Sequence, residues 1–346
     1  NAYGWANIDQ RIPMSLDGLQ NIASISKTFT TTAIMQLYEA GLLQLDEDLN
    51  SILPFVVRNP KRPTDQITVR QLMTHSSFVR DGLSYSRQYA CGDPRFSLSV
   101  WLEQYFTPGG AFYNAEENFH DWEPDSRFEY TNVSFGILGY IVELKSGIPF
   151  PEYCRRHIFS RLGISNTAWM LADVDLTQHV VPYTWIENNT ARGPTWGGIP
   201  LGVIREDGAT LDASLADGYQ ENCVYNHPNY PDGFLRTSVN QLSVYARAYL
   251  NGGEFGGRRI LKNSSIEAML TDQNIPGNRS QGLTWYADQE MAGEPKWGHG
   301  GSDPGSNTDM RLLPAQGVGA IVFANTNGIV PTEISDQLLE LALELV

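Results

Sequence analysis

Ser24 and Lys27 are the residues whose types and spacing first indicate a chemistry. They stand three positions apart, so on a helix their side chains are neighbours on one face. A serine hydroxyl is a weak nucleophile until a base removes its proton. A lysine can be that base when desolvation or a nearby cation keeps it neutral. Because the segment from Ile25 to Thr32 contains no carboxylate, we expect Lys27 to activate Ser24.

The helix that positions this pair is predicted over residues 24–41. Its apolar positions 25, 29, 33, 34, 37 and 40 follow a spacing close to 3.6, and Gly41 is a typical C-terminal stop. Ser24 then lies near the helix N-terminus, where backbone N–H groups and the helix dipole favour a developing oxyanion. The pair therefore predicts a serine hydrolase that forms an acyl-enzyme at Ser24.

Two triplets further along the chain add candidate residues. Tyr130-Thr131-Asn132 precedes a helix predicted over 134–146, and His299-Gly300-Gly301 lies at the end of a strand predicted over 296–300. Tyrosine can relay protons, and asparagine offers both a donor and an acceptor. A second Tyr-x-Asn triplet, at 249–251, is interpreted as a helix terminus because a helix is predicted over 238–250.

Ser-x-x-Lys, Tyr-x-Asn and His-x-Gly, in this order, resemble the motifs of the penicillin-recognising serine hydrolases. That family includes class C β-lactamases, penicillin-binding DD-peptidases, D-aminopeptidases and esterases with a β-lactamase fold. The resemblance runs from about residue 4 to residue 327 and is carried by four stretches at 21–30, 67–77, 233–238 and 297–305.

The resemblance implies a role for each of these residues. Tyr130 would deliver a proton to the leaving group. Asn132 would hold both Lys27 and the substrate amide or ester. His299 would contact the substrate or Tyr130 from across the cleft. These are expectations carried over from the family, residue by residue.

The oxyanion hole is expected from two backbone N–H groups, those of Ser24 and Ser302. Gly301 would let the strand backbone approach the acyl group, because glycine has no side chain. His75 is interpreted as a structural, hydrogen-bonded histidine. The remaining histidines are scattered without metal-ligand spacing, so we expect no metal and no cofactor.

The predicted fold class is α+β, with an antiparallel sheet flanked by helices and a mainly helical lobe, as in β-lactamases and DD-peptidases. Residues 1–20 and 232–346 would form the α/β lobe, with its N-terminal part incomplete because only 23 residues precede Ser24. Residues 21–231 would form the helical lobe, and the active site would lie in the cleft between them.

Smaller elements are predicted as well. Short helices are expected at 46–53, 68–75, 151–162 and 264–270, strands at 283–288, 296–300, 308–314 and 318–325, and a last helix from Thr332. The stretches 84–122 and 171–231 are expected to be loops, because they combine aromatic residues, Gly, Pro and Asn without a sustained period.

The third triplet narrows the expected substrates. In β-lactamases this motif usually begins with a lysine, whose fixed charge helps to bind the drug's carboxylate, whereas this chain has His299. An esterase or a peptidase acting on D-residues is therefore favoured over an efficient β-lactamase. A β-lactamase or DD-carboxypeptidase, a non-catalytic penicillin-binding receptor and an acyltransferase stay open as alternatives.

Composition limits the partners. The net charge of −15 argues against nucleic acid, so a small molecule or peptide is the expected partner. No apolar run approaches the roughly 18 residues of a membrane span. Cys91, Cys154 and Cys223 allow at most one disulfide and are expected to be small buried hydrophobes. The sequence leaves oligomeric state and compartment open, and an exported location is favoured by the resemblance alone.

Overall fold

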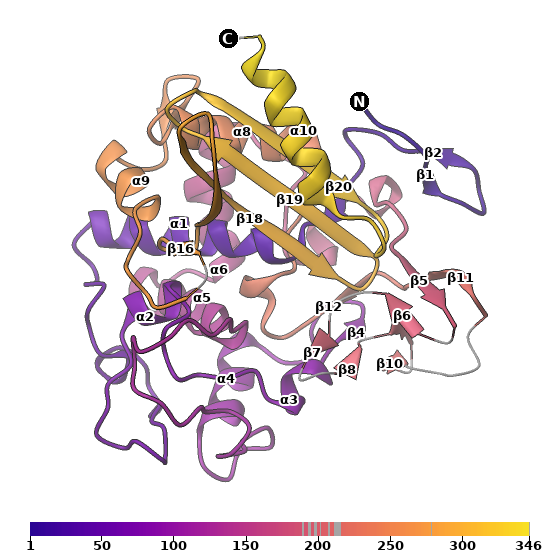
Figure 1. Ribbon diagram of the computed structural model, residues 1–346. Coiled ribbons are helices and arrows are strands. Elements are labelled where there is room, and N and C mark those ends of the chain that lie inside the picture. Colours follow the sequence, from indigo (N-terminus) through magenta and orange to yellow (C-terminus); the bar gives the residue numbers. More distant parts are fainter. Residues whose placement is uncertain are drawn as a thin grey trace.

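A five-stranded antiparallel sheet forms the C-terminal part of the protein (Figure 1). The computed structural model describes residues 1–345 except 189, 193, 194, 197, 198, 201, 207, 211–215 and 278. The strands follow chain order in the sheet, as a meander: β16 (Ser280–Gln281), β17 (Tyr286–Met291), β18 (Glu294–Asp303), β19 (Ser306–Leu313) and β20 (Val318–Ala324). The predicted run of strands is confirmed, although the stretch expected at 283–288 is divided between a turn and β17.

Helices cover both faces of this sheet. Successive side chains of a strand point to opposite faces, and in β19 Met310 joins the main core that includes Leu242 of α8 (Val239–Leu250). Leu313 of β19 instead packs with Leu339 of α10 (Pro331–Leu343), which crosses the other face (Figure 1). The predicted α+β class, with an antiparallel sheet flanked by helices, is therefore confirmed.

The helical part of the protein is built around two buried helices that pack together. α1 (Ser26–Glu39) is buried along most of its length and follows a single 3₁₀ turn, η1 (Ala23–Ile25). α5 (Val133–Ser146) packs against α1 and ends at Gly147, which adopts a left-handed φ of 72°. β18 packs against η1, so Ser24 lies where the sheet meets the helices. The residue limits of the two lobes stay a prediction.

The stretch 84–122 was predicted to be a loop, but it contains the helix α4 (Leu98–Phe106). Ser97 caps this helix by accepting a hydrogen bond from the Val100 N–H. Its buried residues, Leu98, Trp101, Leu102, Tyr105 and Phe106, follow a helical spacing. The cap and this spacing were the local signals, and the aromatic content of the stretch obscured them.

The stretch 171–231 also contains regular structure where loops were predicted. β5 (Tyr183–Glu187) pairs with both β6 (Thr190–Arg192) and β11 (Gly218–Glu221) in a three-stranded sheet. β11 lies more than 25 residues beyond β6, so this pairing depends on a long-range return of the chain. A local period could not reveal it.

A disulfide joins Cys91 to Cys223, across 132 residues of sequence. The two cysteines meet because β4 (Ala90–Cys91) pairs with β12 (Tyr225–Asn226). The prediction of three small buried hydrophobes was therefore wrong for this pair and right for Cys154, which is buried and free.

The remaining elements are short. They are β1 (Trp5–Asn7), β2 (Ile12–Pro13), β3 (Gln20–Asn21), η2 (Leu49–Ser51), α2 (Val69–Met73), α3 (Leu83–Ser86), α6 (Phe150–Cys154), η3 (Arg155–Phe159), α7 (Ser160–Leu162), η4 (Leu171–Asp173), η5 (Leu176–Gln178), β7 (Thr195–Trp196), β8 (Ile199–Pro200), β9 (Val203–Arg205), β10 (Gly208–Thr210), η6 (Tyr230–Asp232), β13 (Arg236–Thr237), β14 (Glu254–Phe255), β15 (Arg258–Arg259) and α9 (Asn263–Met269).

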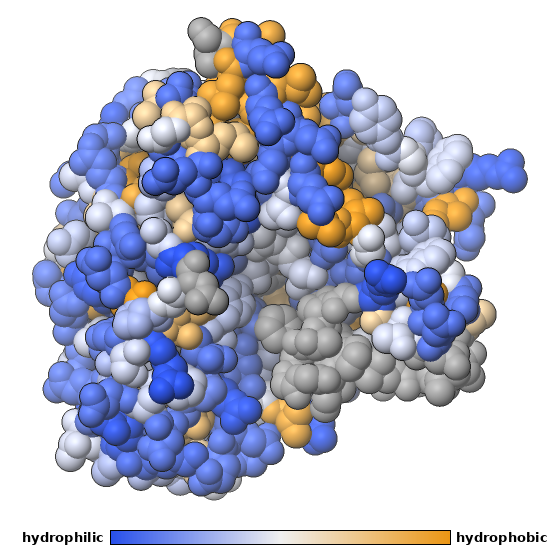
Figure 2. Space-filling view, in the orientation of Figure 1, coloured by the Kyte–Doolittle hydropathy of each residue, from blue (hydrophilic) through white to orange (hydrophobic). Residues whose placement is uncertain are grey.

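The outer side of α10 presents apolar side chains to solvent. Ile334, Leu338 and Leu341 are 41%, 42% and 57% exposed, and Figure 2 shows apolar residues gathered at this end of the molecule. Among the described residues, no single helix is long and apolar enough to cross a membrane, and one pair bent by 74°, Val133–Ser146 with Phe150–Leu162, meets the criterion only when both helices are counted together.

Candidate active site

Ser24 lies in η1, directly before α1, and its side chain is half-buried. The residue before it, Ala23, has a φ of 47°, a left-handed conformation that costs an alanine roughly 1–2 kcal/mol. The Ala23 N–H donates to Asn21 Oδ1 at 2.9 Å, which fixes this turn. Strain of this kind persists where the surrounding structure enforces it. The turn at Ala23 sets the direction in which the Ser24 side chain points.

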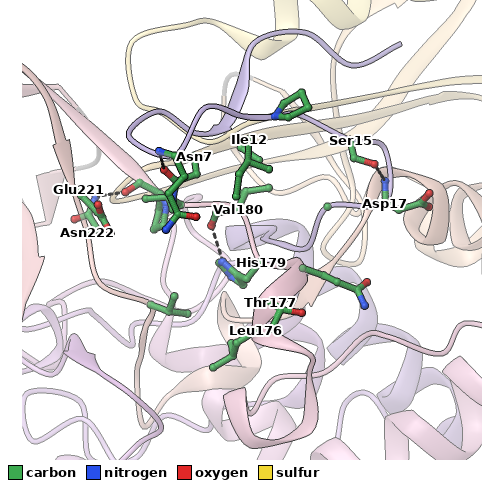
Figure 3. Close-up of a pocket in the computed structure, with 18 of the residues that line it drawn as sticks. Asn7, Ile12, Ser15, Asp17, Leu176, Thr177, His179, Val180, Glu221 and Asn222 are labelled. Carbon is green, nitrogen blue, oxygen red and sulfur yellow. Dashed lines mark hydrogen bonds between the residues drawn. The ribbon is translucent and has the colours of Figure 1, made fainter.

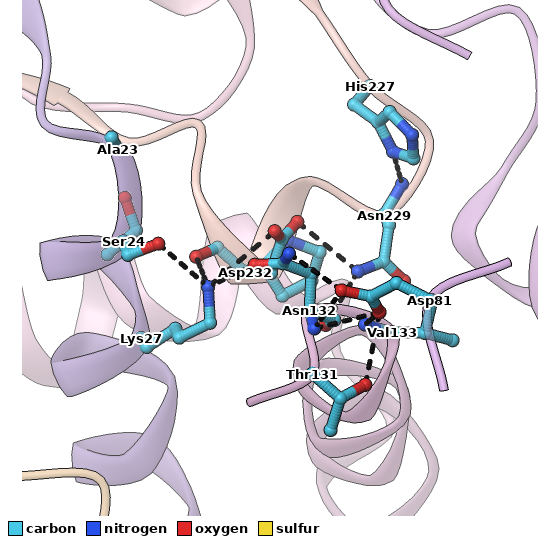
Figure 4. Close-up of polar contacts among 12 residues, drawn as sticks. Ala23, Ser24, Lys27, Asp81, Thr131, Asn132, Val133, His227, Asn229 and Asp232 are labelled. Carbon is cyan, nitrogen blue, oxygen red and sulfur yellow. Dashed lines mark hydrogen bonds and ion pairs between the residues drawn. The ribbon is translucent and has the colours of Figure 1, made fainter. Parts of the chain in front are cut away.

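Lys27 is fully buried and donates hydrogen bonds to three acceptors (Figure 4). Its Nζ lies 3.1 Å from Ser24 Oγ, 2.7 Å from Asn132 Oδ1 and 2.8 Å from the backbone oxygen of Asp232. An ammonium has three N–H donors, so this environment matches the protonated form. The predicted approach of Ser24, Lys27 and Asn132 is what the structure shows.

A carboxylate also stands beside Lys27, contrary to the sequence expectation. Asp232 Oδ2 lies 3.7 Å from Lys27 Nζ, and both side chains are buried. Burial lowers the pKa of Lys27, but the phenolate form of Tyr130 and the Asp232 carboxylate outweigh it, so the pKa of Lys27 is raised. The expectation of an uncompensated lysine was wrong because Asp232 is 205 residues away in the sequence.

Asp81 fixes the orientation of Asn132 from a distant loop. Its carboxylate accepts hydrogen bonds from the backbone N–H groups of Asn132 and Val133, both at 2.9 Å, and from Asn132 Nδ2 at 2.8 Å. The amide nitrogen of Asn132 is thereby held at Asp81, and its oxygen is left for Lys27. Asp81 also satisfies free N–H groups at the start of α5. No local pattern pointed to Asp81.

Tyr130 is held beside Lys27 by a stack on His75. The Tyr130 and His75 rings are 4.4 Å apart, and Lys27 Nζ is 5.0 Å from the centre of the Tyr130 ring. Burial raises the pKa of Tyr130, while Lys27 and Ser24 act to lower it, and the net direction is upward. Tyr130 is therefore a neutral phenol at neutral pH, with a proton that it can give.

His75 is buried, and its Nδ1 accepts the N–H of Thr131 at 3.1 Å. Burial, and then the charge of Lys27, hold the pKa of His75 well below its usual value. This neutral ring supports Tyr130 through the stack and through the backbone of the next residue, which agrees with the structural interpretation.

His299 lies across from Tyr130 on β18, with ring centres 6.4 Å apart. Its Nδ1 pairs with the Gly300 oxygen at 2.6 Å, which assigns the ring proton to Nδ1 and leaves Nε2 as an acceptor. Nε2 is buried without a hydrogen-bond partner. Burial, and then Lys27, hold the pKa of His299 well below its usual value, so the ring is neutral rather than partly charged near pH 7.

Gly301 is required by the packing of β18 against the segment that precedes Ser24. A Cβ on Gly301 would lie 2.4 Å from Thr308 Oγ1 and 2.5 Å from the Ile22 oxygen. The side that lacks a side chain therefore faces Ile22 and Thr308. The missing side chain therefore lets β18 pack closely against this segment, and the expected approach of its backbone to an acyl group stays a prediction.

Ser302 directs its backbone N–H toward the free edge of β18. The Gly300 N–H donates to Tyr286 Oη at 3.1 Å, on the β17 side of the strand. Backbone groups alternate in direction with a period of two, so the Ser302 N–H points the same way. The pairing of β17 with β18 stops at Tyr286 opposite Gly298, which leaves the Ser302 N–H beyond the end of β17.

Two buried carboxylates behind the site are held by neutral donors. Asp303 accepts from Tyr89 Oη at 2.9 Å and from Asn21 Nδ2 at 3.1 Å. Asp232 accepts from Tyr85 Oη at 2.8 Å. Burial is the main cause that raises the pKa of Asp232 to about 6 and that of Asp303 to about 7.

A separate cavity of about 580 Å³ lies between the N-terminal hairpin and the segments 176–182 and 221–224 (Figure 3). It is lined in part by Ile12 and His179, whose Nδ1 pairs with the Val180 oxygen. None of the predicted site residues lines it. In the described part of the chain, no group of three or more His, Cys, Asp or Glu side chains is placed to hold a metal ion.

The sequence of this chain is similar to those of known penicillin-binding proteins. The chain is 24% identical over 347 residues to penicillin-binding protein 4 of Amycolatopsis lactamdurans, covering 96% of this chain and 79% of the relative. It is 23% identical over 296 residues to penicillin-binding protein 4* of Bacillus subtilis, covering 79% of this chain and 59% of the relative. The chain therefore spans little more than half the length of the second relative.

Solved structures share the fold. The D-amino acid amidase of Ochrobactrum anthropi superposes with a TM-score of 0.75 at 20% identity, covering 98% of this chain and 89% of that one. The octameric penicillin-binding protein homologue of Pyrococcus abyssi gives 0.68 at 23% identity, covering 99% and 70%. Residues 1–344 match the family described as Beta-lactamase. With its Ser24–Lys27 pair in the position described above, the chain belongs to the β-lactamase family of serine hydrolases.

Proposed function

We propose that this protein hydrolyses an ester or an amide through an acyl-enzyme at Ser24. The observation that carries the proposal is the buried Lys27 ammonium, hydrogen-bonded at once to Ser24 Oγ and to Asn132 Oδ1. This arrangement supports Ser24 as nucleophile, Lys27 and Tyr130 as the proton-handling pair, and Asn132 as the group that orients Lys27 and the substrate.

The charge states define the first step. Lys27 is an ammonium and Tyr130 a neutral phenol, so one proton must leave this pair before Ser24 can react. The deprotonated pair then takes the Ser24 proton while Oγ bonds to the carbonyl carbon. The N–H groups of Ser24 and Ser302 are proposed to hold the resulting oxyanion.

The second half of the reaction returns the protons. The bond to the leaving alcohol or amine breaks as Tyr130 delivers the proton to it, and the acyl group stays on Ser24. Water then adds to this ester, gives one proton to the Lys27–Tyr130 pair, and releases the acid with Ser24 protonated again. The proton count closes without a cofactor.

The buried neutral His299 supports an ester or a D-residue amide as substrate over an efficient β-lactamase reaction. A β-lactam drug carries a carboxylate, and His299 offers it no charge in this position. The similarity to a D-amino acid amidase and to penicillin-binding proteins is compatible with this choice. The preference for D-residue amides is the finer part of the proposal.

Intact-protein mass spectrometry tests the mechanism. Wild-type protein and Ser24→Ala are exposed to a fluorophosphonate and to a penicillin, and p-nitrophenyl ester turnover is measured in parallel. We expect one adduct per wild-type chain, none on Ser24→Ala, and turnover in the wild type alone. A folded wild-type protein with neither adduct nor turnover would favour a non-catalytic member of the family, and adduct without turnover would favour a receptor.

A further inference from the structure

Asn21, the last residue of β3, lies buried three positions before Ser24 and uses both ends of its side-chain amide. Its Oδ1 accepts the Ala23 N–H at 2.9 Å, and its Nδ2 donates to Asp303 Oδ2 at 3.1 Å. These partners assign the two ends of the amide, because a backbone N–H needs an acceptor and a carboxylate needs a donor. Asparagine therefore fits this position, whereas a second carboxylate would repel Asp303.

The bond to Ala23 holds the strained turn that precedes the nucleophile. Ala23 has a left-handed φ of 47°, which an alanine keeps only where its surroundings enforce it. Without the Asn21 oxygen, this buried N–H would lose its hydrogen-bond partner. The turn would then be free to relax toward an ordinary backbone conformation, and the Ser24 N–H that follows it would rotate.

The bond to Asp303 reaches the end of β18, at the residue that directly follows Ser302. Asp303 is itself held on two sides. Tyr89 Oη donates to Asp303 Oδ1 at 2.9 Å, and Asn327 Nδ2 donates to the Asp303 backbone oxygen at 2.9 Å. The Asn21 amide therefore ties the turn before the nucleophile to a fixed point beside Ser302.

The two N–H groups proposed for the oxyanion hole belong to segments far apart in the sequence. Such a hole works when both donors lie within hydrogen-bond distance of the place where the oxyanion forms. Their separation is therefore set by tertiary contacts between the Ser24 turn and β18. Asn21 bonds to the residue before Ser24 and to the residue after Ser302, so one amide acts on both donors.

We propose that Asn21 is a positioning residue of this active site, whose side-chain amide holds the Ser24 and Ser302 N–H groups at the separation that the oxyanion requires. It acts through the backbone of its neighbours and not by touching the substrate. The inference rests on the proposed hydrolase function and adds to it the side chain that sets the geometry of the oxyanion hole.

Asn21→Ala removes both bonds and tests the proposal. It should lower kcat for a p-nitrophenyl ester roughly 10- to 100-fold, because small misplacements weaken hydrogen bonds to the oxyanion. KM should change less than about threefold, since the bound ester carries no oxyanion. An arylboronic acid forms a tetrahedral adduct on Ser24 that places an oxygen in the oxyanion hole. Its Ki should rise in parallel with the loss of kcat.

Gln20→Ala is the matched control for a loss of stability alone. Gln20 is the buried neighbour of Asn21, and its Nε2 donates to Ser306 Oγ at 3.0 Å and to the Ala324 oxygen at 2.7 Å. Its loss should lower the free energy of unfolding, measured with urea, about as much as Asn21→Ala does, and leave kcat within about twofold of the wild type. If both variants lower kcat equally, the proposal is wrong.

A second variant exchanges the amide and the carboxylate by combining Asn21→Asp with Asp303→Asn. The Ala23 N–H keeps an acceptor, the pair keeps one donor, and Tyr89 Oη keeps an acceptor. The combined variant should recover kcat to within about fivefold of the wild type, because the hydrogen bonds are restored with their direction reversed. A combined variant as slow as Asn21→Ala would overturn the proposal.

The outcomes separate this proposal from the proposed function. Suppose that a fluorophosphonate labels the wild type and that the wild type turns over the ester, but Asn21→Ala has the same kcat and the same boronate Ki. The positioning role is then wrong, and the hydrolase proposal stands. A folded wild type that is neither labelled nor active would overturn both.

Discussion

The helical and the strand walls of the active site differ in how their polar groups are satisfied. On the helical wall, Lys27 uses three acceptors, and Asp81 accepts both N–H groups at the start of α5 and the amide of Asn132. On the strand wall, His299 Nε2 and Arg279 Nε are buried without partners. On the helical side, His75 Nε2 is also buried without a partner, but the groups that contact Lys27 and Asn132 are all hydrogen-bonded.

This difference separates two tasks. The hydrogen bonds around Lys27, Asn132 and Asp81 are made before substrate arrives, so they fix charge and geometry for the proposed chemical step. Buried groups that lack partners are satisfied when a ligand brings them, so they contribute to the choice of substrate. Changes on the helical wall should therefore lower the rate for every substrate, and changes on the strand wall should alter the preference among substrates.

Lys27→Met should have the largest effect. It removes the group that contacts Ser24 and Asn132, and the loss of a proton-handling residue costs roughly 100- to 10,000-fold. Fluorophosphonate labelling rates and ester turnover measure it, with circular dichroism as the check on folding. An equal loss for esters with and without a carboxylate is expected. A change confined to one of them would contradict the division between the two walls.

Asp81→Ala should come next, because it frees the start of α5 and the Asn132 side chain. Leaving buried N–H groups unsatisfied should lower the free energy of unfolding by about 3 kcal/mol. Misplacement of Asn132 should lower kcat roughly 100-fold. Urea unfolding and ester turnover measure the two effects. Asp81→Asn keeps one acceptor oxygen and should lie between Asp81→Ala and the wild type, and the same activity in all three would exclude a positioning role.

Asp232→Asn should move the pH dependence of acylation. The Asp232 carboxylate, 3.7 Å from Lys27 Nζ, helps to raise the pKa of Lys27, so removing it lets the Lys27–Tyr130 pair lose its proton at lower pH. Acylation requires the pair to lose this proton. The rising limb of the acylation rate against pH should therefore shift to lower pH by roughly one unit. Fluorophosphonate labelling rates between pH 5 and 10 measure the shift.

Asp303→Asn is the matched control for this experiment. Its carboxylate oxygens are bonded to Tyr89 and Asn21, and the charge of Lys27 is the smallest influence on its pKa. In Asp303→Asn, the rising limb of the labelling rate against pH should move much less than it does in Asp232→Asn. Equal shifts in the two variants would mean that the total charge of the cluster, and not the contact with Lys27, sets the pH dependence.

Asp303→Asn should itself have the smallest effect on activity and a measurable effect on stability. Burial, and then the charge of Asp232, raise the pKa of Asp303 to about 7, above its value in the unfolded chain. Its contribution to stability is then complete below about pH 4 and is lost as the pH rises through about 7. Between pH 4 and 8 the wild type should lose roughly 2–4 kcal/mol more than Asp303→Asn. Urea unfolding at both values checks this, and parallel curves would contradict it.

The sequence by itself identified Ser24 and Lys27 as a candidate pair, and it determined the long helices and the C-terminal run of strands. Each depends on local spacing: three residues between Ser24 and Lys27, and the helical and strand periods of the segments around them. The order of the three motifs indicated the family, and this resemblance made Tyr130, Asn132 and His299 candidate site residues. Their proposed roles still await the experiments above.

The tertiary structure alone decided which charges surround these residues. Asp81 and Asn132 are 51 positions apart, Lys27 and Asp232 are 205 apart, and the two cysteines of the disulfide are 132 apart. The one signal for Asp232 was its place directly before the stretch 233–238 that resembles the family. Electrostatic interactions depend on distance and burial, neither of which a local pattern records. The sequence therefore identified Lys27, and the fold decided that it is an ammonium.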